Sequence, residues 1–97
     1  MWLAQLDKVR PVIVLTRDPM GRHLNSVIVA PVTSTIRGLS TEVPVDHEDG
    51  VRRPSVANLD NVQLLGRTSF LKLVGTARPF TLHAICAALA IAVDCEP

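Results

Sequence analysis

Residues 26–34 read Ser-Val-Ile-Val-Ala-Pro-Val-Thr-Ser, a β-branched and almost uniformly apolar run that closes on hydroxyl side chains. A short run of this composition predicts a buried β-strand, here over residues 26–32. Residues 10–15, which read Arg-Pro-Val-Ile-Val-Leu, predict a second strand that is buried on both faces. We place Pro11 at the start of that strand, because proline cannot donate a hydrogen bond in the middle of a ladder. The simplest arrangement pairs the two strands antiparallel, with a turn at residues 18–21 in the long loop between them.

Shorter runs on either side of this pair predict the rest of a sheet. Apolar or alternating segments indicate strands at residues 1–6, 41–45, 55–57, 62–65 and 72–76. The first of these is expected to be an edge strand, and a helical turn is expected at residues 70–71. Residues 46–54 are predicted to form a loop that is first acidic and then basic.

One helix is predicted, from about Pro79 to Val93, because proline suits the first helical position. Apolar side chains recur there at three- and four-residue spacing, and this stripe comprises Leu82, Ile85, Cys86, Leu89 and Val93. The remaining positions are rich in alanine, so the helix is apolar nearly all round, which favours cover on a second side by another subunit. Many short strands and one terminal helix predict a mainly β fold with a C-terminal helix (α+β), built on a small bent sheet or partial barrel.

The 97 residues suit a single domain, 1–97, whose core is small enough to favour a homodimer. Charged residues appear before any long apolar run, so no secretory signal peptide is predicted. The most apolar run, residues 85–93, is too short to span a bilayer. The two cysteines make no disulfide framework and show no metal-ligand spacing. We therefore expect a cytoplasmic protein that uses no membrane, metal or cofactor.

Charge is unevenly distributed, although the net charge is only +1. Residues 1–37 and 51–78 are net basic, and they flank an acidic stretch at residues 38–50. A local basic patch can hold phosphates, whereas scattered and solvated charge is the alternative. The sequence contains no glycine-rich phosphate loop, and its three histidines are scattered, which favours solvent-exposed or interface positions for them.

The ends of the two long strands carry the residues best suited to chemistry. The first residue of one antiparallel strand lies near the last residue of its neighbour, so Arg10 and Thr33 could meet at one end of the sheet. An arginine offers five donors and a permanent charge to a phosphate, and a threonine hydroxyl can donate to a non-bridging oxygen. RNA supplies its own nucleophile, the 2′-hydroxyl, so a protein need only orient and stabilise it. The structural alternative pairs Arg10 with Asp7 or a loop carboxylate and leaves Thr33 as a turn cap.

Around these residues the chain resembles the MazF/PemK family of toxin endoribonucleases. The matching blocks are residues 2–7, 10–15, 27–34, 55–62 and 74–76 followed by the helix, and they cover nearly the whole chain in order and spacing. The resemblance implies an SH3-like barrel of the MazF/CcdB/Kid type, a homodimer, and metal-independent cleavage of single-stranded RNA at short sequences. The implied products end in a 2′,3′-cyclic phosphate and a 5′-hydroxyl. It also implies a cognate antitoxin whose disordered C-terminal tail occupies the RNA groove.

Carried over to this sequence, the catalytic pair of the family corresponds to Arg10 and Thr33. Arginine is essentially never deprotonated near neutral pH, so Arg10 is assigned to stabilising the phosphate and the leaving group, and the proton acceptor stays open. Weaker candidates for RNA contact are Thr16, Arg17, Ser34 and Asn61. Two features differ from the family pattern: Trp2 follows Met1 directly, where a basic residue, a glycine and an acid are usual, and the loop at 7–9 is shorter.

Three functions are therefore compatible with the sequence. The first is the endoribonuclease just described, the second is a toxin of the same fold that poisons a protein, as the related CcdB gyrase inhibitors do, and the third is a non-catalytic RNA- or peptide-binding module. The presence of both Arg10 and Thr33 favours the first over the second. Single-stranded RNA readers commonly stack bases on aromatic rings, and this chain has only one tryptophan and two phenylalanines, which weighs against the third.

Overall fold

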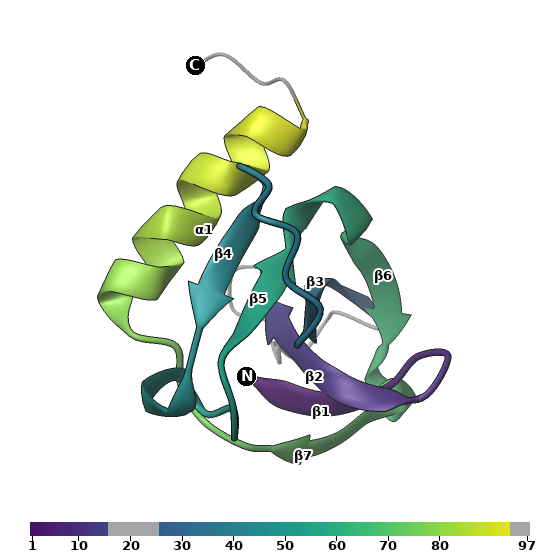
Figure 1. Ribbon diagram of the computed structural model, residues 1–97. Helices are drawn as coiled ribbons and strands as arrows, with labels where there is room; N and C mark the ends of the chain where they lie inside the picture. Colours follow the sequence, from purple (N-terminus) through teal and green to yellow (C-terminus); the bar gives the residue numbers. More distant parts are fainter. Residues whose placement is uncertain (16–25, 94–97) are drawn as a thin grey trace.

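The computed structural model describes residues 1–15 and 26–93, which form a bent antiparallel sheet and one long helix (Figure 1). The strands are β1 Trp2–Gln5, β2 Val9–Val14, β3 Ser26–Thr33, β4 Glu42–Val45, β5 Ser55–Asn58, β6 Gln63–Gly66 and β7 Phe70–Leu73. Single turns of 3-10 helix lie between strands at η1 His47–Asp49, η2 Leu59–Asn61 and η3 Arg67–Ser69, and the long helix is α1 Pro79–Ala92. The turn predicted at residues 18–21 lies outside the described residues.

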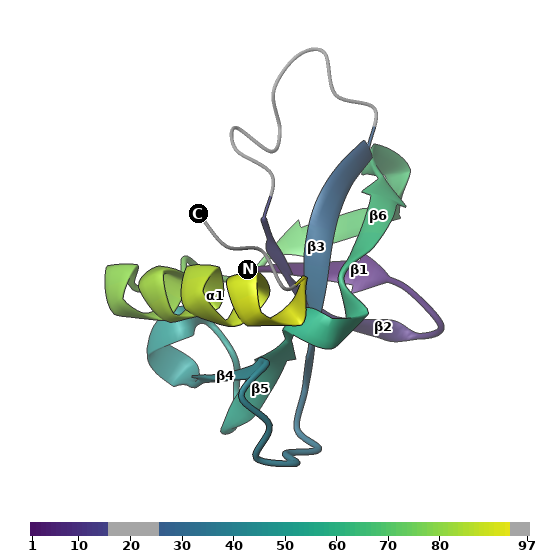
Figure 2. The ribbon, with the colours of Figure 1, turned by 90° about the horizontal axis from the view of Figure 1, so that it is seen from above.

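The sheet is organised around β3, its longest strand. The strand order is β4-β5-β3-β2-β1-β7, and β6 pairs with β3 as well. One side of β3 pairs antiparallel with β2, while β6 and β5 pair with successive parts of its length, at residues 26–29 and 32–33. The predicted antiparallel pairing of the two long strands is confirmed. The change of partner along β3 lets the sheet turn through the large angle that Figure 2 shows between β5 and β6.

Two apolar clusters lie on the two faces of β2, since successive side chains of a strand point in opposite directions. Val12 belongs to one cluster, with Ala4, and Ile13 belongs to the other, with Ala30. Both β2 side chains are almost inaccessible to solvent. Burial on both faces is therefore confirmed at the centre of this strand, while Val9 at its beginning is exposed.

Helix α1 begins at Pro79, as predicted, and lies along β4 and η2 (Figure 1). It buries Thr81, Ile85 and Ala88, and Leu89 is partly buried beside them. The predicted stripe is wrong at three positions that are exposed, namely Leu82, Cys86 and Val93. A helix that is apolar nearly all round gives a weak directional signal, so the sequence pattern alone does not decide which face packs against the sheet. Within residues 1–15 and 26–93, no helix is long and apolar enough to cross a membrane.

Large apolar side chains remain exposed on α1 and on the strands β6 and β7. They are Leu64, Leu71, Leu73, Phe80, Leu82 and Ile91. Phe80 is 79% exposed, which is unusual for a side chain that buries so much apolar area when it is covered. Exposure of this kind is consistent with the predicted subunit interface, which stays a prediction.

Two expectations for the strands are wrong. β1, expected at an edge, lies between β2 and β7. The helical turn expected at residues 70–71 occurs instead at η3, and Phe70 opens β7. The Phe70 ring meets the Trp2 ring edge-on with centroids 5.8 Å apart, and β7 pairs with β1. Phe70–Leu73 is a strand because it pairs with β1 from the other end of the chain, and the local sequence pattern carries no sign of that pairing.

Candidate functional site

Strands β2 and β3 part at the end of the sheet where Arg10 and Thr33 lie. Their ladder runs as far as the pair formed by Val12 and Pro31. From Val32 onwards β3 pairs with β5 instead. Continued by two residues, the register of β2 and β3 would set Arg10 opposite Thr33, so both residues stand where the two strands open away from each other.

Two prolines suit this parting. The Leu15 N–H donates to the Ile28 carbonyl, so the odd-numbered residues of β2 occupy the hydrogen-bonded rungs with β3. Pro11, which lacks an N–H, therefore faces the point where β3 has already turned away. Pro31 lies opposite Val12 at a position of the ladder where β3 makes no hydrogen bonds to β2. On the other edge of β3, Pro31 lies between the residues that pair with β6 and those that pair with β5. Neither proline costs the sheet a hydrogen bond, although Pro11 is the third residue of β2 and not its first.

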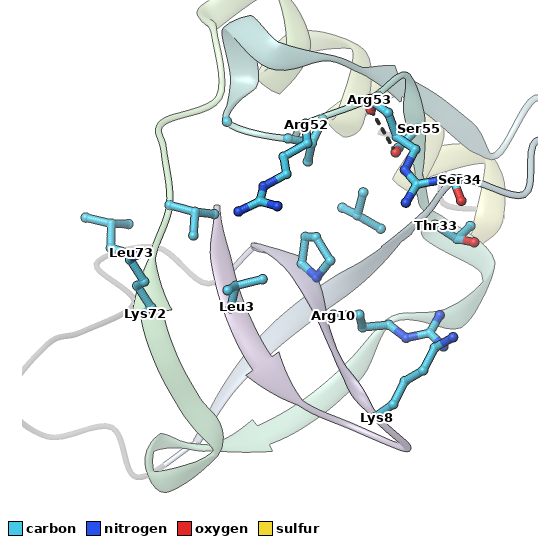
Figure 3. Close-up of a pocket in the computed structure, with 15 residues that line it drawn as sticks. Leu3, Lys8, Arg10, Thr33, Ser34, Arg52, Arg53, Ser55, Lys72 and Leu73 are labelled. Atoms are coloured by element: carbon cyan, nitrogen blue, oxygen red, sulfur yellow. Dashed lines mark hydrogen bonds between the residues drawn. The ribbon is translucent and has the colours of Figure 1, made fainter.

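A cavity of about 620 Å³, called here the main cavity, opens where the strands part (Figure 3). Figure 3 shows Lys8 and Arg10 on one side of it, with Arg52 and Arg53 reaching in from the opposite side. Its lining residues come from five strands and from the loops before β2, β4, β5 and α1, and are Leu3, Lys8, Arg10, Pro11, Val32, Thr33, Ser34, Gly50, Val51, Arg52, Arg53, Ser55, Lys72, Leu73 and Val74.

The main cavity is strongly cationic. Its lining includes Lys8, Arg10, Arg52, Arg53 and Lys72, and no aspartate or glutamate is among the described residues that form it. Cations gathered in a concave site raise the local potential and attract a polyanion, whatever the net charge of the chain. The cavity is therefore suited to phosphate groups.

Arg10 stands partly buried in the wall of this cavity. Its Nη2 donates to Asp7 Oδ2 at 3.2 Å, but the Asp7 side chain is 72% exposed, so the pair belongs to the weak surface class. The Nε atom of Arg10 is buried and has no hydrogen-bond partner among the residues that the structure describes. A buried donor without an acceptor costs free energy, which an anion bound in the cavity would recover.

Thr33 ends β3 beside the same cavity. Its hydroxyl oxygen accepts from the N–H of Thr35 at 3.1 Å, which fixes the oxygen in place. A hydroxyl that accepts in this way can still donate its hydrogen, and no acceptor for that hydrogen is found in the described part of the chain. Both contacts of the structural alternative, the Arg10–Asp7 pair and the Thr33 turn cap, are thus present, and neither uses the Arg10 Nε–H or the Thr33 O–H.

A second cavity of about 350 Å³ shares Lys8, Arg10, Thr33 and Ser34 with the main cavity. The rest of its lining is Pro31, Thr35, Arg37, Glu42, Asn58 and Asn61. Four of the six residues singled out in the sequence therefore lie together: Arg10, Thr33 and Ser34 line both cavities, and Asn61 lines the second. The other two, Thr16 and Arg17, lie outside the described residues. The roles assigned to all six stay predictions.

A buried carboxylate anchors the loop that carries the arginines into the main cavity. Asp49, which is fully buried, accepts from the Arg78 backbone N–H at 2.9 Å, from Nε at 3.2 Å and from Nη2 at 3.0 Å. Burial opposes ionisation of Asp49, but the hydrogen bonds from Arg78 outweigh it and hold the Asp49 pKa at about 2. The hydrogen bond with Asp49 in turn raises the pKa of Arg78. Arg78 also pairs with Asp46 and Glu48, so these acidic side chains have a cation of their own outside the cavity lining.

The sequence did not identify several residues of the two cavities. Lys8, Arg52, Arg53 and Lys72 belong to stretches recognised as basic, but nothing in the sequence separated them from Arg78, which holds a loop. Glu42 gave no signal at all, since it reads as one member of an acidic stretch. The spacing of the strands located the end of the sheet, and only the fold shows which charges reach it.

Comparison with known proteins connects this geometry to a family. A family model described as "PemK-like, MazF-like toxin of type II toxin-antitoxin system" matches residues 2–93. The chain belongs to this MazF-like toxin family. Among curated MazF relatives, "Endoribonuclease MazF3" of Mycobacterium tuberculosis is 43% identical over 94 residues, which cover 97% of this chain and 91% of the relative. "Probable endoribonuclease MazF5" of the same organism is 38% identical over 99 residues, which cover 99% and 91%.

Solved MazF structures confirm the predicted fold class, an antiparallel sheet of MazF type with one C-terminal helix. The structure titled "Mycobacterium tuberculosis toxin MazF-mt6" has a TM-score of 0.93 at 42% identity, covering 99% of this chain and 97% of that one. A second, titled "Endoribonuclease in complex with its cognate antitoxin from Mycobacterial species", has a TM-score of 0.88 at 26% identity and covers 99% and 92%.

Proposed function

We propose that this MazF-like chain is an endoribonuclease toxin that cleaves single-stranded RNA at the point where β2 and β3 part. The observation that carries the proposal is that Arg10 and Thr33 line the same cavity, whose lining has five cationic side chains, Arg10 included. Each of the two residues has a donor, Arg10 Nε–H and the Thr33 hydroxyl, without an acceptor among the described residues. Among the relatives, those named endoribonuclease support this function over the other two hypotheses.

The proposed reaction needs no nucleophile from the protein. The 2′-hydroxyl oxygen of the RNA attacks the adjacent phosphorus, the bond to the 5′-oxygen breaks, and the products end in a 2′,3′-cyclic phosphate and a 5′-hydroxyl. The 2′ proton leaves to solvent, and the departing 5′-oxygen gains a proton from solvent. Negative charge on the phosphoryl oxygens rises towards the transition state, so donors that are already in place stabilise it more than the ground state.

Each of the two residues has a distinct part in this proposal. The guanidinium of Arg10 supplies a permanent charge and a free Nε–H to the phosphoryl oxygens. The Thr33 hydroxyl, whose oxygen is fixed by Thr35, donates to a non-bridging oxygen. No divalent ion is part of this mechanism.

The surrounding residues would hold the RNA strand. Lys8, Arg52, Arg53 and Lys72 contact phosphates on either side of the scissile one, since they line the main cavity with Arg10. Ser34 and Asn61 contact the RNA at the second cavity, where the structure has them in the lining. Thr16 and Arg17 stay candidates for further contacts.

Two protein partners complete the proposal. We infer that a cognate antitoxin with a disordered C-terminal tail competes with RNA for the cationic groove, as the relative solved with its cognate antitoxin suggests. A second copy of the chain is the other partner, forming a homodimer through exposed apolar side chains such as Phe80. The toxin would act in the cytoplasm, where RNA and antitoxin are both present.

The test is to incubate the purified chain with total RNA and to sequence the newly formed 5′-hydroxyl ends. We expect cleavage at a short motif, and a loss of about 10²–10³-fold in rate for Arg10→Ala, because one donor to the developing charge is removed. Arg67→Ala, in η3 and outside the lining of both cavities, is the matched control and should cleave like the parent. A parent chain that releases no 5′-hydroxyl ends, or an Arg10→Ala chain as active as the parent, contradicts the proposal.

A further inference from the structure

Glu42 is a buried carboxylate in which one oxygen accepts several hydrogen bonds and the other accepts none from the described residues. Its Oε1 accepts the backbone N–H groups of Arg37, Gly38 and Leu39 at 3.0, 2.9 and 3.2 Å. Its Oε2 is buried and has no hydrogen-bond partner in the described part of the chain. The side chain is only 8% exposed, so one oxygen holds a turn while the other is an acceptor without a donor.

The turn explains why the carboxylate stays where it is. Three N–H groups converging on Oε1 fix both the position and the orientation of the group, so Oε2 cannot rotate away to find a donor elsewhere. A buried carboxylate oxygen that lacks a donor costs free energy, and such an atom in a folded protein calls for a specific explanation. Glu42 lines the second cavity, so a ligand bound there could supply the missing donor.

A second polar atom without a partner among the described residues belongs to Arg10, which lines the same cavity. Within residues 1–15 and 26–93, Arg10 Nε is a buried donor without an acceptor, and Glu42 Oε2 is a buried acceptor without a donor. A single ion would satisfy one of them and repel the other. A ligand that satisfies both must present an acceptor, best an anionic oxygen, to Arg10 and a hydrogen-bond donor to Glu42. A nucleotide does so, with its phosphate and with the edge of its base.

We propose that Glu42 Oε2 accepts an N–H group from the exocyclic amine of a nucleobase, and so selects a base with an amine over uracil at one position of the cleaved motif. This inference rests on the proposed ribonuclease function and adds a specificity-determining residue to it. Cytosine, adenine and guanine carry such an amine, and carboxylates are known partners of the cytosine amine in nucleic-acid recognition. Uracil presents carbonyl oxygens there, whose lone pairs face the carboxylate unfavourably.

The polar groups around Glu42 fit this role. Asn58 and Asn61 line the same cavity and can donate to or accept from the rest of the base edge. Asn58 is also the cross-strand partner of Glu42, so the two side chains are held in one register by the β4–β5 ladder. Glu42 and Asn58 therefore stand on paired strands, and Asn61 lies in η2, which directly follows β5.

The decisive variant is Glu42→Gln. Glutamine keeps an oxygen for the three N–H groups of the turn but replaces the unpaired oxygen with an NH₂ donor, so the preference should invert. With a randomised single-stranded RNA library, the parent should favour an amine-bearing base at one motif position by about tenfold or more over uracil. The variant should lose that preference and gain activity on uracil at the same position. Glu48→Gln, the same change at an exposed carboxylate outside both cavities, should leave the motif unchanged.

A second measurement uses the parent chain alone, so that it does not depend on the folding of the variant. In the preferred motif, the amine-bearing base is replaced by its analogue without the amine, purine riboside for adenosine, inosine for guanosine, or pyrimidin-2-one riboside for cytidine. We expect the rate to fall by about tenfold or more at one position.

The outcomes separate the two proposals. A Glu42→Gln chain that keeps the parent motif, or that loses rate equally on every sequence, overturns the role of Glu42 while the ribonuclease function stands. Full activity of the parent on the amine-free analogues overturns it equally. A parent chain that cleaves no RNA overturns the ribonuclease proposal and this inference with it.

Discussion

The backbones of Gly50 and Gly75 cross in direct contact. A Cβ atom on Gly75 would lie 2.6 Å from the Gly50 Cα atom, and one on Gly50 would lie 2.9 Å from the Gly75 Cα atom. Gly50 also has a φ of 110°, in the region that L side chains rarely adopt. The crossing ties the loop after η1, which carries Arg52 and Arg53 of the main cavity, to the segment before α1.

We predict that Gly75→Ala destabilises the chain by about 2 kcal/mol or more, because the new methyl group meets backbone that cannot move aside. Unfolding in urea, followed by circular dichroism, measures the change. Gly66→Ala is the matched control, since nothing lies within 4 Å of the position of its Cβ atom and its φ is −68°. An equal effect of the two substitutions would show that the crossing is not the cause.

Asp49→Asn should destabilise the chain near neutral pH and matter much less in acid. The folded chain holds the Asp49 pKa at about 2, below its ordinary value of 3.8. A depressed carboxyl pKa contributes stability above the unfolded-state pKa, here by about 2 kcal/mol, and that contribution is lost as pH falls from about 4 through about 2.

The measurement compares urea unfolding of parent and Asp49→Asn chains at about pH 7 and about pH 2. Asp7→Asn, which changes an exposed carboxylate, serves as the control and should alter stability little at either pH. A gap between the parent and Asp49→Asn chains that stays the same at both pH values is the result that contradicts the prediction.

Much of this architecture could be read from the sequence, for identifiable physical reasons. The runs that became β2 and β3 are long, β-branched and doubly buried, so their existence and pairing follow from composition. That pairing also located Arg10 and Thr33, because the register of an antiparallel ladder brings opposite strand ends together. The helix start followed from Pro79.

The rest depends on contacts between residues far apart in the chain. Phe70 begins a strand because β1 offers it a partner and Trp2 offers it a ring, and its own neighbours carry no such signal. Arg53 and Arg78 look alike in the sequence, yet one lines a cavity and the other closes on Asp49. Glu42 differs from the other described acidic residues in having a buried oxygen, Oε2, without a hydrogen-bond donor among the described residues. A pattern of residue types cannot predict such a feature.

Substitutions at Thr33 should separate its hydroxyl from its shape. Thr33→Val keeps the branched side chain and removes the donor, so we expect RNA cleavage to slow by about 100-fold or more. Thr33→Ser keeps the hydroxyl and should retain most of the activity. Single-turnover rates on one labelled oligonucleotide provide the measurement. Equal rates for the parent and Thr33→Val chains would remove Thr33 from the mechanism.

The cations of the main cavity should govern the salt dependence of binding. Replacing Arg52, Arg53 or Lys72 with alanine should weaken binding of single-stranded RNA and lower the slope of log affinity against log salt by about 0.7 for each lost phosphate contact. Fluorescence anisotropy with a substrate whose scissile 2′-hydroxyl is methylated measures binding without cleavage. Arg67→Ala, outside the cavity lining, should leave the slope unchanged. Parent-like slopes in all three variants would contradict phosphate contact at these residues.

Cleavage should proceed fully in EDTA, since the proposed donors to the phosphate are side chains of the protein and the nucleophile belongs to the RNA. The rate in EDTA is compared with that in added magnesium at matched ionic strength, because salt alone changes binding. Restoration of lost activity by a divalent ion would contradict the mechanism proposed here.

The pairing of β3 with three strands, β2 along one edge and β6 and β5 along the other, has a consequence for how the molecule fluctuates. A strand that is shared among three partners cannot detach locally without disturbing both apolar clusters, so amide hydrogens at Val29 and Ala30 should exchange only when the whole domain opens. Under the proposed function, Arg10 and Thr33 would then hold the phosphate from strands that are expected to open last. Substitutions in the surrounding loops would then change which RNA sequences the proposed enzyme prefers, while the positions of Arg10 and Thr33 stay the same.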